Sequence, residues 1–105
     1  MPRIIRSQIV LSLAVSLASA VCVAQSPGQA TYQARCQMCH GATGTPSAGM
    51  AKMMSIKPVS DPAIKALTAD QMFTAVKDGK GKMKPVTGLT DAQIKDAVAF
   101  YRGLN

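Results

Sequence analysis

The residues best suited to chemistry lie together in the run Cys36-Gln37-Met38-Cys39-His40. Two cysteines three positions apart near a helix end point the same way, so both thiols can reach the vinyl groups of one haem edge. The adjoining histidine is then placed to reach the iron from one side. A C-x-x-C-H run is typical of covalent haem attachment. We therefore expect haem c at Cys36 and Cys39, with His40 as an iron ligand.

Three other interpretations of this motif fit the sequence less well. A thioredoxin-like redox pair also has C-x-x-C spacing, but it expects a strand followed by a helix, and no such context is found. A structural zinc site would need a fourth ligand, and no Cys or His follows His40. A disulfide between Cys36 and Cys39 would close a very small ring and stabilise little. Haem attachment is the preferred interpretation.

The second axial ligand has to be another residue type, because His40 is the only histidine. Methionine is the usual alternative in c-type electron carriers, and it raises the reduction potential. The methionine between the two cysteines, Met38, lies on the same side of the iron as the histidine, so it cannot reach the opposite face. Met72 falls in an apolar helical stripe that predicts core packing. Met83 lies in a Gly-rich loop after a helix, where the backbone can bring its sulfur to a metal. We expect Met83 as the ligand, with Met50 or Met54 as alternatives.

Two helices that must position this loop carry clear starting signals. Thr68 with Gln71, and Thr90 with Gln93, are capping-box pairs. Gly79 predicts the end of the first of these helices. Each start is followed by an apolar stripe at helical spacing. The stripes consist of Ala69, Met72, Phe73 and Val76, and of Ile94, Ala97, Val98 and Tyr101.

A further helix, from about residue 28 to residue 38, is predicted to carry the two cysteines on one face. Residues 41–49 are rich in Gly, Pro, Thr and Ser and predict a loop. Residues 51–56 form a short helical turn in this interpretation, stopped by Pro58 and Pro62. No strand pattern is found. The sequence thus predicts an all-α fold with three main helices and loops long enough to enclose a cofactor.

The chain of 105 residues is enough for one domain. It opens with two arginines and an uncharged, mostly apolar stretch that ends in small residues, which is typical of a secretory signal peptide. We predict a signal peptide at 1–24, cleaved after Ala24, and a haem domain at 25–105. Cleavage after Ala20 and retention as a membrane anchor remain as alternatives.

Lys and Arg outnumber Asp and Glu by 12 to 5, which gives a net charge of +7. There is no Arg cluster and few aromatic residues, so nucleic acid is not the expected partner. Lysines at 77, 80, 82 and 84 surround Met83, and such a cluster fits docking to an acidic redox protein. Exposed lysines near a helix end are also ordinary. We expect acidic partner proteins, a monomer, and no stable membrane insertion after cleavage.

Residues 25–105 resemble the small bacterial class I c-type cytochromes, the group that includes the c6-, c551- and c553-like carriers. The shared residues are Gly28, Tyr32, the C-x-x-C-H-G run, Gly79-Lys80-Gly81-Lys82-Met83 and the helix start Leu89-Thr90-Asp91-Ala92-Gln93-Ile94. The resemblance implies the class I cytochrome c fold around one haem. It also implies that the first and last helices cross, with Gly28 and Tyr32 facing Tyr101.

In that family a proline in the loop after the haem motif commonly accepts a hydrogen bond from the ligand histidine through its carbonyl oxygen. Pro46 is the candidate here, and such a bond would fix the ring. One departure concerns the axial loop, since family members often have Met-Pro where Lys84 separates Met83 from Pro85. This insertion affects the expected loop shape and leaves the haem motif unchanged.

The function expected from these residues is electron transport by an exported, periplasmic carrier with one covalent haem c. Both axial positions would be filled, so the protein would not be an enzyme. The alternative is a haem enzyme or a gas or ligand sensor with an open sixth coordination site. No distal His or Arg is evident to assist peroxide chemistry. A chain this small, with so few aromatics, should be largely unfolded without its cofactor.

Overall fold

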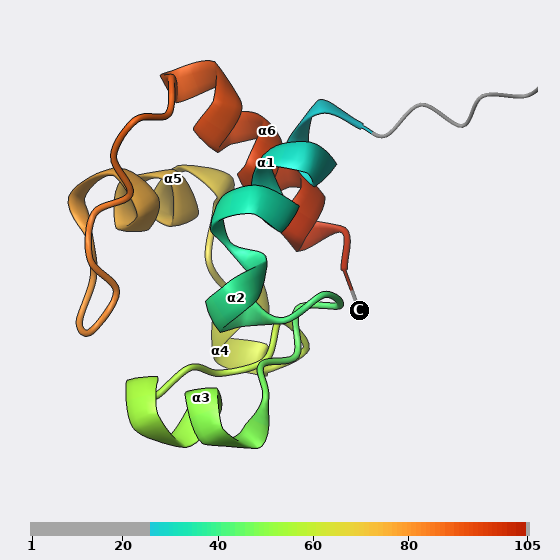
Figure 1. Ribbon diagram of the computed structural model, residues 1–105, viewed down its shortest axis with the longest axis vertical. Coiled ribbons are helices and arrows are strands. Elements are labelled where there is room, and N and C mark those ends of the chain that lie inside the picture. The colour runs from blue at the N-terminus through green and yellow to red at the C-terminus, as the bar shows by residue number, and fades with distance from the viewer. Residues whose placement is uncertain (1–25, 105) are drawn as a thin grey trace, which may run out of the picture.

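Six helices make up the part of the chain that the computed structural model describes, residues 26–104 (Figure 1). They are α1 (Pro27–Arg35), α2 (Gln37–His40), α3 (Ala48–Met54), α4 (Pro62–Lys65), α5 (Ala69–Asp78) and α6 (Asp91–Arg102). Within this part, the one β-type pairing is an isolated bridge between Lys80 and Met83. The expected all-α class is therefore confirmed. The predicted signal peptide, 1–24, lies outside the described residues.

Helices α1 and α6 cross at very short range (Figure 1). A Cβ atom on Gly28 would lie 1.9 Å from the backbone oxygen of Asp96, so only glycine allows this approach. Next to the crossing, Tyr32 is 1% exposed, and its ring lies 6.0 Å from that of Tyr101 and 5.3 Å from that of Phe100. The predicted crossing is thus present, with Phe100 as an additional partner.

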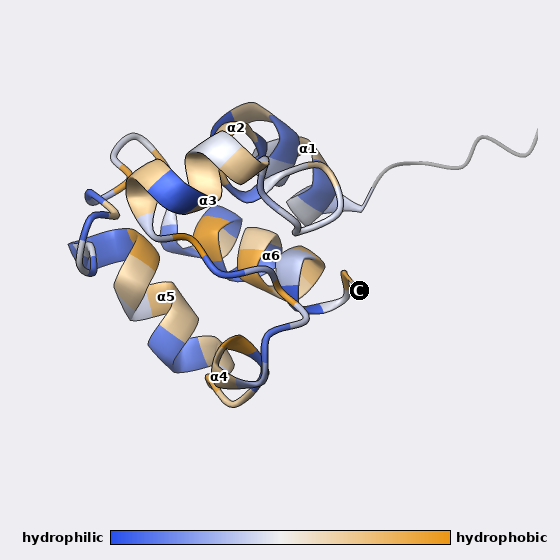
Figure 2. Ribbon diagram, turned by 90° about the horizontal axis from the view of Figure 1, so that it is seen from below, coloured by the Kyte–Doolittle hydropathy of each residue, from blue (hydrophilic) through white to orange (hydrophobic). Residues whose placement is uncertain are grey.

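The main hydrophobic cluster lies between α5 and α6, where Met72, Ile94 and Val98 are buried. Both predicted capping boxes are formed, with each Thr hydroxyl accepting a hydrogen bond from a Gln backbone N–H and each Gln side chain accepting one in return. In Figure 2 the strongly hydrophobic segments of α6 lie towards the middle of the molecule. Partly buried residues complete the cluster: Ile64, Leu67, Phe73, Val76, Leu89 and Tyr101.

Three boundaries differ from the prediction. The helix that carries the cysteines is interrupted at Cys36, where φ is −117°, and it restarts as α2. The third helix begins at Ala48, because the Ser47 hydroxyl caps it by accepting from the Met50 N–H. Pro62 was expected to stop a helix, but it lies at the start of α4. Proline is tolerated there because the backbone N–H groups of the first turn have no acceptor within the helix.

No helix within residues 26–104 is long and apolar enough to cross a membrane.

The crossing of α1 and α6 makes a specific prediction about stability. Gly28→Ala should lower the free energy of unfolding of the haem-loaded protein by about 1–3 kcal/mol, because the new methyl group overpacks the interface. Urea unfolding followed by circular dichroism measures this change. Gly49→Ala is the matched control, since a Cβ at Gly49 meets no atom within 4 Å. A Gly28→Ala protein as stable as the control would contradict the proposed importance of the close approach.

Candidate functional site

A large cavity of about 870 Å³ lies between the helices of the described region. Cofactor and ligand sites commonly have volumes of this order. Its walls come from the end of α1 and from α2, from residues 54–57, from the inner faces of α5 and α6, and from the loop at residues 80–84. The lining is predominantly apolar. It combines segments that are far apart in the sequence.

Four of the predicted site residues line this cavity together: Cys36, Cys39, His40 and Met83. The first three come from the C-x-x-C-H run, and Met83 comes from the loop after α5. Pro46, which was predicted as a further site residue, is buried but is not part of the lining. The structure thus brings together both halves of the predicted site.

The orientation of His40 depends on contacts made by its neighbours. The Tyr32 hydroxyl donates a 2.6 Å hydrogen bond to the backbone oxygen of Gly41, directly after the histidine. Gly41 ends α2 with a φ of 82°, and a Cβ there would lie 2.0 Å from the Thr45 oxygen, so glycine is required. The ring of Tyr101 meets the His40 ring edge-on, with 5.5 Å between the centroids. Tyr101 therefore contacts the imidazole directly, whereas Tyr32 and Gly41 fix the backbone that follows it.

Burial lowers the pKa of His40, which keeps the imidazole neutral at pH 7, the form that binds metals. Within the described region its Nδ1 atom is buried and has no hydrogen-bond partner. The expected hydrogen bond to the Pro46 carbonyl is therefore not formed in this structure. The loop instead approaches the end of α2 through the Thr45 carbonyl, which lies against Gly41.

Cys36 and Cys39 are free thiols in this structure, so they form no disulfide. Burial raises the pKa of the Cys36 thiol, an effect that Arg35 opposes and Cys39 reinforces. Within residues 26–104, no group of three or more His, Cys, Asp or Glu side chains could hold a metal ion. The disulfide and zinc interpretations therefore find no support here, and two thiols remain available for covalent bonding.

The cavity also narrows the choice among the methionines. Met83 and Met54 line it, whereas Met50 does not. Met72 reaches it too, but it is 8% exposed and belongs to the core cluster, as predicted. Met38 points away from the protein with 86% of its surface exposed. Met83 is the predicted ligand, and Met54 is the alternative that remains.

Backbone hydrogen bonds shape the loop that carries Met83. Lys80 and Met83 each donate an N–H to the other's oxygen, at 2.9 and 3.0 Å. Pro85 packs closely against Gly79 at the end of α5. A Cβ atom added to Gly79 would lie 2.8 Å from the Cδ atom of Pro85. Val86 then donates to the Val76 oxygen at 2.9 Å, which returns the chain to α5. These contacts close the loop even though Lys84 separates Met83 from Pro85.

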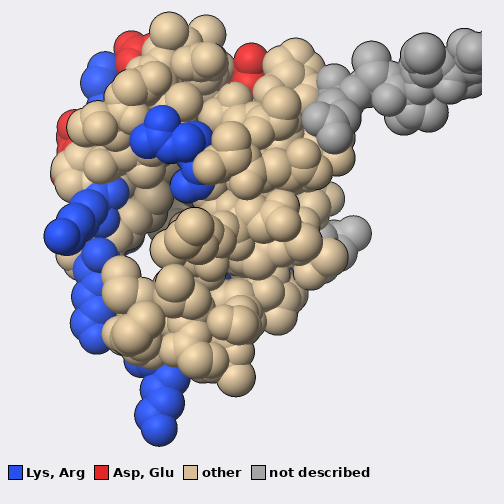
Figure 3. Space-filling model, in the orientation of Figure 1, with Lys and Arg blue, Asp and Glu red and all other residues tan. Residues whose placement is uncertain are grey.

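Positively charged residues surround the cavity, and we call this set the basic rim: Arg35, Lys57, Lys80, Lys82 and Lys84. Figure 3 shows basic side chains along one edge of the molecule, beside the hollow. Lys77, predicted as part of the cluster, lies outside the cavity lining and forms a 2.9 Å ion pair with Asp91. That hydrogen bond raises the pKa of Lys77. Sequence spacing gave no signal for Arg35 and Lys57, which lie far from Met83 along the chain.

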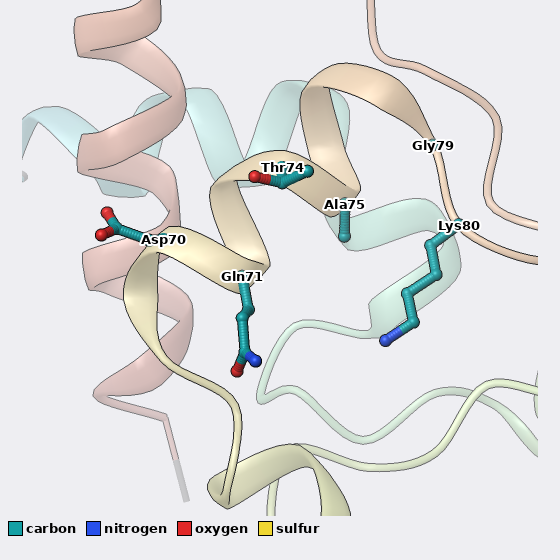
Figure 4. A pocket seen from close by; sticks show the side chains of 6 residues that line it. All are labelled: Asp70, Gln71, Thr74, Ala75, Gly79 and Lys80. Carbon is teal, nitrogen blue, oxygen red and sulfur yellow. The ribbon is translucent and has the colours of Figure 1, made fainter.

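A second, smaller hollow of about 350 Å³ lies on α5 (Figure 4). It is lined by Asp70, Gln71, Thr74, Ala75, Gly79 and Lys80. It contains no cysteine, histidine or methionine. We therefore assign the candidate site to the larger cavity.

The helical architecture, the crossing of α1 and α6 and the cavity around the C-x-x-C-H run define a c-type cytochrome with the class I fold. The chain belongs to the family described as cytochrome c oxidase, cbb3-type, subunit III, whose sequence model matches residues 23–100. Among solved structures, the KustC0563 c-type cytochrome is similar, with a TM-score of 0.64 and 24% identity over 72% of this chain and 94% of that chain. A Tyr-to-Phe mutant of Kustc0563 aligns with a TM-score of 0.65 and 21% identity over 75% and 99%. A comparison with curated proteins gives no significant match.

Membership of this family implies covalently bound haem c and haem-based electron transfer. The residues present fit such a group. The cavity offers two free thiols, a neutral histidine and an apolar lining, and these are the features that thioether bonds, iron ligation and a flat hydrophobic macrocycle require.

Because the cavity is large and apolar, we predict that the chain folds only with its cofactor bound. A Cys36→Ser, Cys39→Ser double variant, which cannot form thioethers, should lose most of its helical signal in far-UV circular dichroism. Without a cofactor the apolar side chains around about 870 Å³ would face water, and the buried core that remains is small. The haem-loaded wild type is the reference. A double variant with full helical content and a cooperative thermal transition would show that the chain folds without help.

Proposed function

We propose that this chain is an exported one-electron carrier that holds one haem c, with His40 and Met83 as the axial ligands. Cys36 and Cys39 would form the thioether bonds. The observation that carries the proposal is that these four side chains, from two distant segments, line one apolar cavity. On the motifs that it shares with them, we also propose that the protein is a carrier of the c6-, c551- and c553-like kind.

Each ligand has a role that follows from its surroundings. When bound, the haem supplies a one-electron couple between Fe(II) and Fe(III). His40 is kept neutral by burial, Tyr101 contacts its ring, and the Tyr32 hydrogen bond to Gly41 fixes the adjoining backbone. Met83 provides a soft, uncharged thioether, which favours the reduced iron and a higher potential. With two protein side chains in the axial positions, no position is left for a substrate, and transfer between redox proteins is the fitting role.

Export is part of the proposal and rests on the sequence. Residues 1–24 have the basic start, apolar stretch and small-residue exit of a signal peptide. Cleavage after Ala24 would remove Cys22 and leave a periplasmic domain at 25–105. The remaining cysteines would then be the two that bind haem, so no stray thiol would persist in an oxidising compartment.

The axial ligand can be tested by absorption spectroscopy of the oxidised, haem-loaded protein. Wild type should have a low-spin spectrum with the far-red band of Met–iron ligation, and Met83→Ala should lose that band. Met54→Ala is the matched control, because Met54 is the other methionine that lines the cavity without belonging to the core cluster. This variant should keep the band.

Other outcomes would change the assignment in defined ways. Survival of the band in Met83→Ala, together with its loss in Met54→Ala, would transfer the ligand role to Met54. A high-spin wild type, or one that binds carbon monoxide readily, would overturn the closed carrier site and favour the enzyme or sensor.

The basic rim supports a further part of the proposal, namely docking to acidic redox partners. Its members come from α1, from the segment after α3 and from the Met83 loop, so positive charge surrounds the mouth of the cavity on several sides. A positive potential at this mouth attracts acidic surfaces and raises the rate of encounter, more strongly at low salt. Partners would therefore approach where the cofactor is nearest to the surface.

This charge distribution predicts opposite effects on two probe reagents. Lys80→Gln should slow oxidation of the reduced protein by ferricyanide, an anion, and accelerate oxidation by a cationic cobalt complex. Each change should be about two- to threefold at low salt, as expected for one exposed charge. Stopped-flow absorbance gives both rates. Lys65→Gln, on α4 outside the cavity lining, removes the same charge and should change neither rate. Equal effects of the two variants would show that the oxidation rates depend on the net charge of the protein and not on the charges of the basic rim.

A further inference from the structure

Helix α3 and the residues that follow it form one wall of the cavity without close packing on another helix. The helix pairs that pack extensively in the described region are α1 with α6, α5 with α6, and α1 with α2. Residues 54–57, at the end of α3 and just beyond it, nevertheless line the cavity. Contacts other than helix packing must hold this wall in place.

One such contact joins α3 directly to the loop that carries Met83. The Nζ atom of Lys82 donates a 3.2 Å hydrogen bond to the backbone oxygen of Met53. Met53 lies in the last turn of α3, where carbonyl oxygens lack N–H donors within the helix and a cation is favoured by the helix dipole. In Figure 1 the loop after α5 descends towards α3. The bond therefore links two walls of the cavity at the residue next to Met83.

The backbone at the same end of α3 is strained. Ser55 ends the helix in the left-handed region, with φ 57° and ψ 40°, and within residues 26–104 it is the one non-glycine residue with a positive φ. Such a conformation persists only where surrounding contacts hold it. It turns the chain so that Met54 and Ile56, on either side, line the cavity. The N–H groups of Ser55 and Ile56 both donate to the Ala51 oxygen, and the Lys82 bond adds a contact from another segment to the same turn.

We propose that Lys82 is a positioning residue for the axial ligand. Its hydrogen bond to the Met53 carbonyl holds the Met83 loop against the α3 wall, and this slows the release of Met83 from the iron. The inference rests on the proposed function in one respect, the assignment of Met83. Lys84, on the other side of Met83, also lines the cavity, but the lysines that form side-chain hydrogen bonds in the described region are Lys77 and Lys82.

This difference gives a matched pair of variants, Lys82→Ala and Lys84→Ala, with Lys82→Arg to restore a donor. The measurement is imidazole binding to the oxidised, haem-loaded protein, whose rate at saturating imidazole equals the rate of Met83 release. Lys82→Ala should raise this rate about fivefold, the typical effect of losing one hydrogen bond. Lys84→Ala should leave it unchanged. Lys82→Arg should return it close to the wild-type rate.

Equal rates for the two alanine variants would overturn the inference, whether both rise or neither does. Hydrogen exchange at the backbone amides of Lys80 and Met83 gives a second readout that does not depend on which residue binds the iron. These amides should lose protection in Lys82→Ala but not in Lys84→Ala. If wild type lacks the far-red band, the assignment of Met83 fails, and the exchange comparison alone then decides whether Lys82 holds the loop.

Discussion

The site depends above all on the absence of a side chain at Gly28. Because α1 can lie directly on the backbone of α6 there, Tyr32 is buried beside the crossing and its hydroxyl reaches the backbone oxygen of Gly41. The same crossing places Tyr101 against the ring of His40. A steric condition at one end of α1 thus fixes the histidine beyond its other end, in the adjoining helix α2. The stability of the fold and the orientation of His40 both depend on this one contact.

The molecule otherwise divides into a well-packed half and a weakly packed half. Helices α1, α5 and α6 share the close packing, to which α4 adds Ile64, while α3 and the Met83 loop are held mainly by hydrogen bonds and caps. The cavity lies between them, and most of its lining is apolar. Apolar side chains that would pack on one another in an ordinary core surround this space instead. A bound hydrophobic group would therefore complete the core.

The sequence predicts best those features that are encoded by neighbouring residues. The two capping boxes, the core position of Met72 and the meeting of Cys36, Cys39 and His40 in one place follow from local spacing, and the glycine and tyrosines of the crossing follow from the family resemblance. Contacts between remote segments carried no comparable signal. Arg35 and Lys57 reach the cavity, and Lys82 reaches Met53, only because the fold brings separate loops together. The start of α4 at Pro62 was missed because proline stops a helix in its interior but is tolerated in its first turn.

The pairing of α1 with α6 also has a consequence for the timing of assembly. It joins the two ends of the described chain, and contacts between remote segments form slowly because a long loop has to close first. Until then Cys36 is open to solvent, whereas in the finished fold it is partly buried and its thiol is less acidic. The interval before closure is therefore when the thiols react most easily. Because folding is predicted to depend on the cofactor, we expect the crossing to close only after the thiols have reacted.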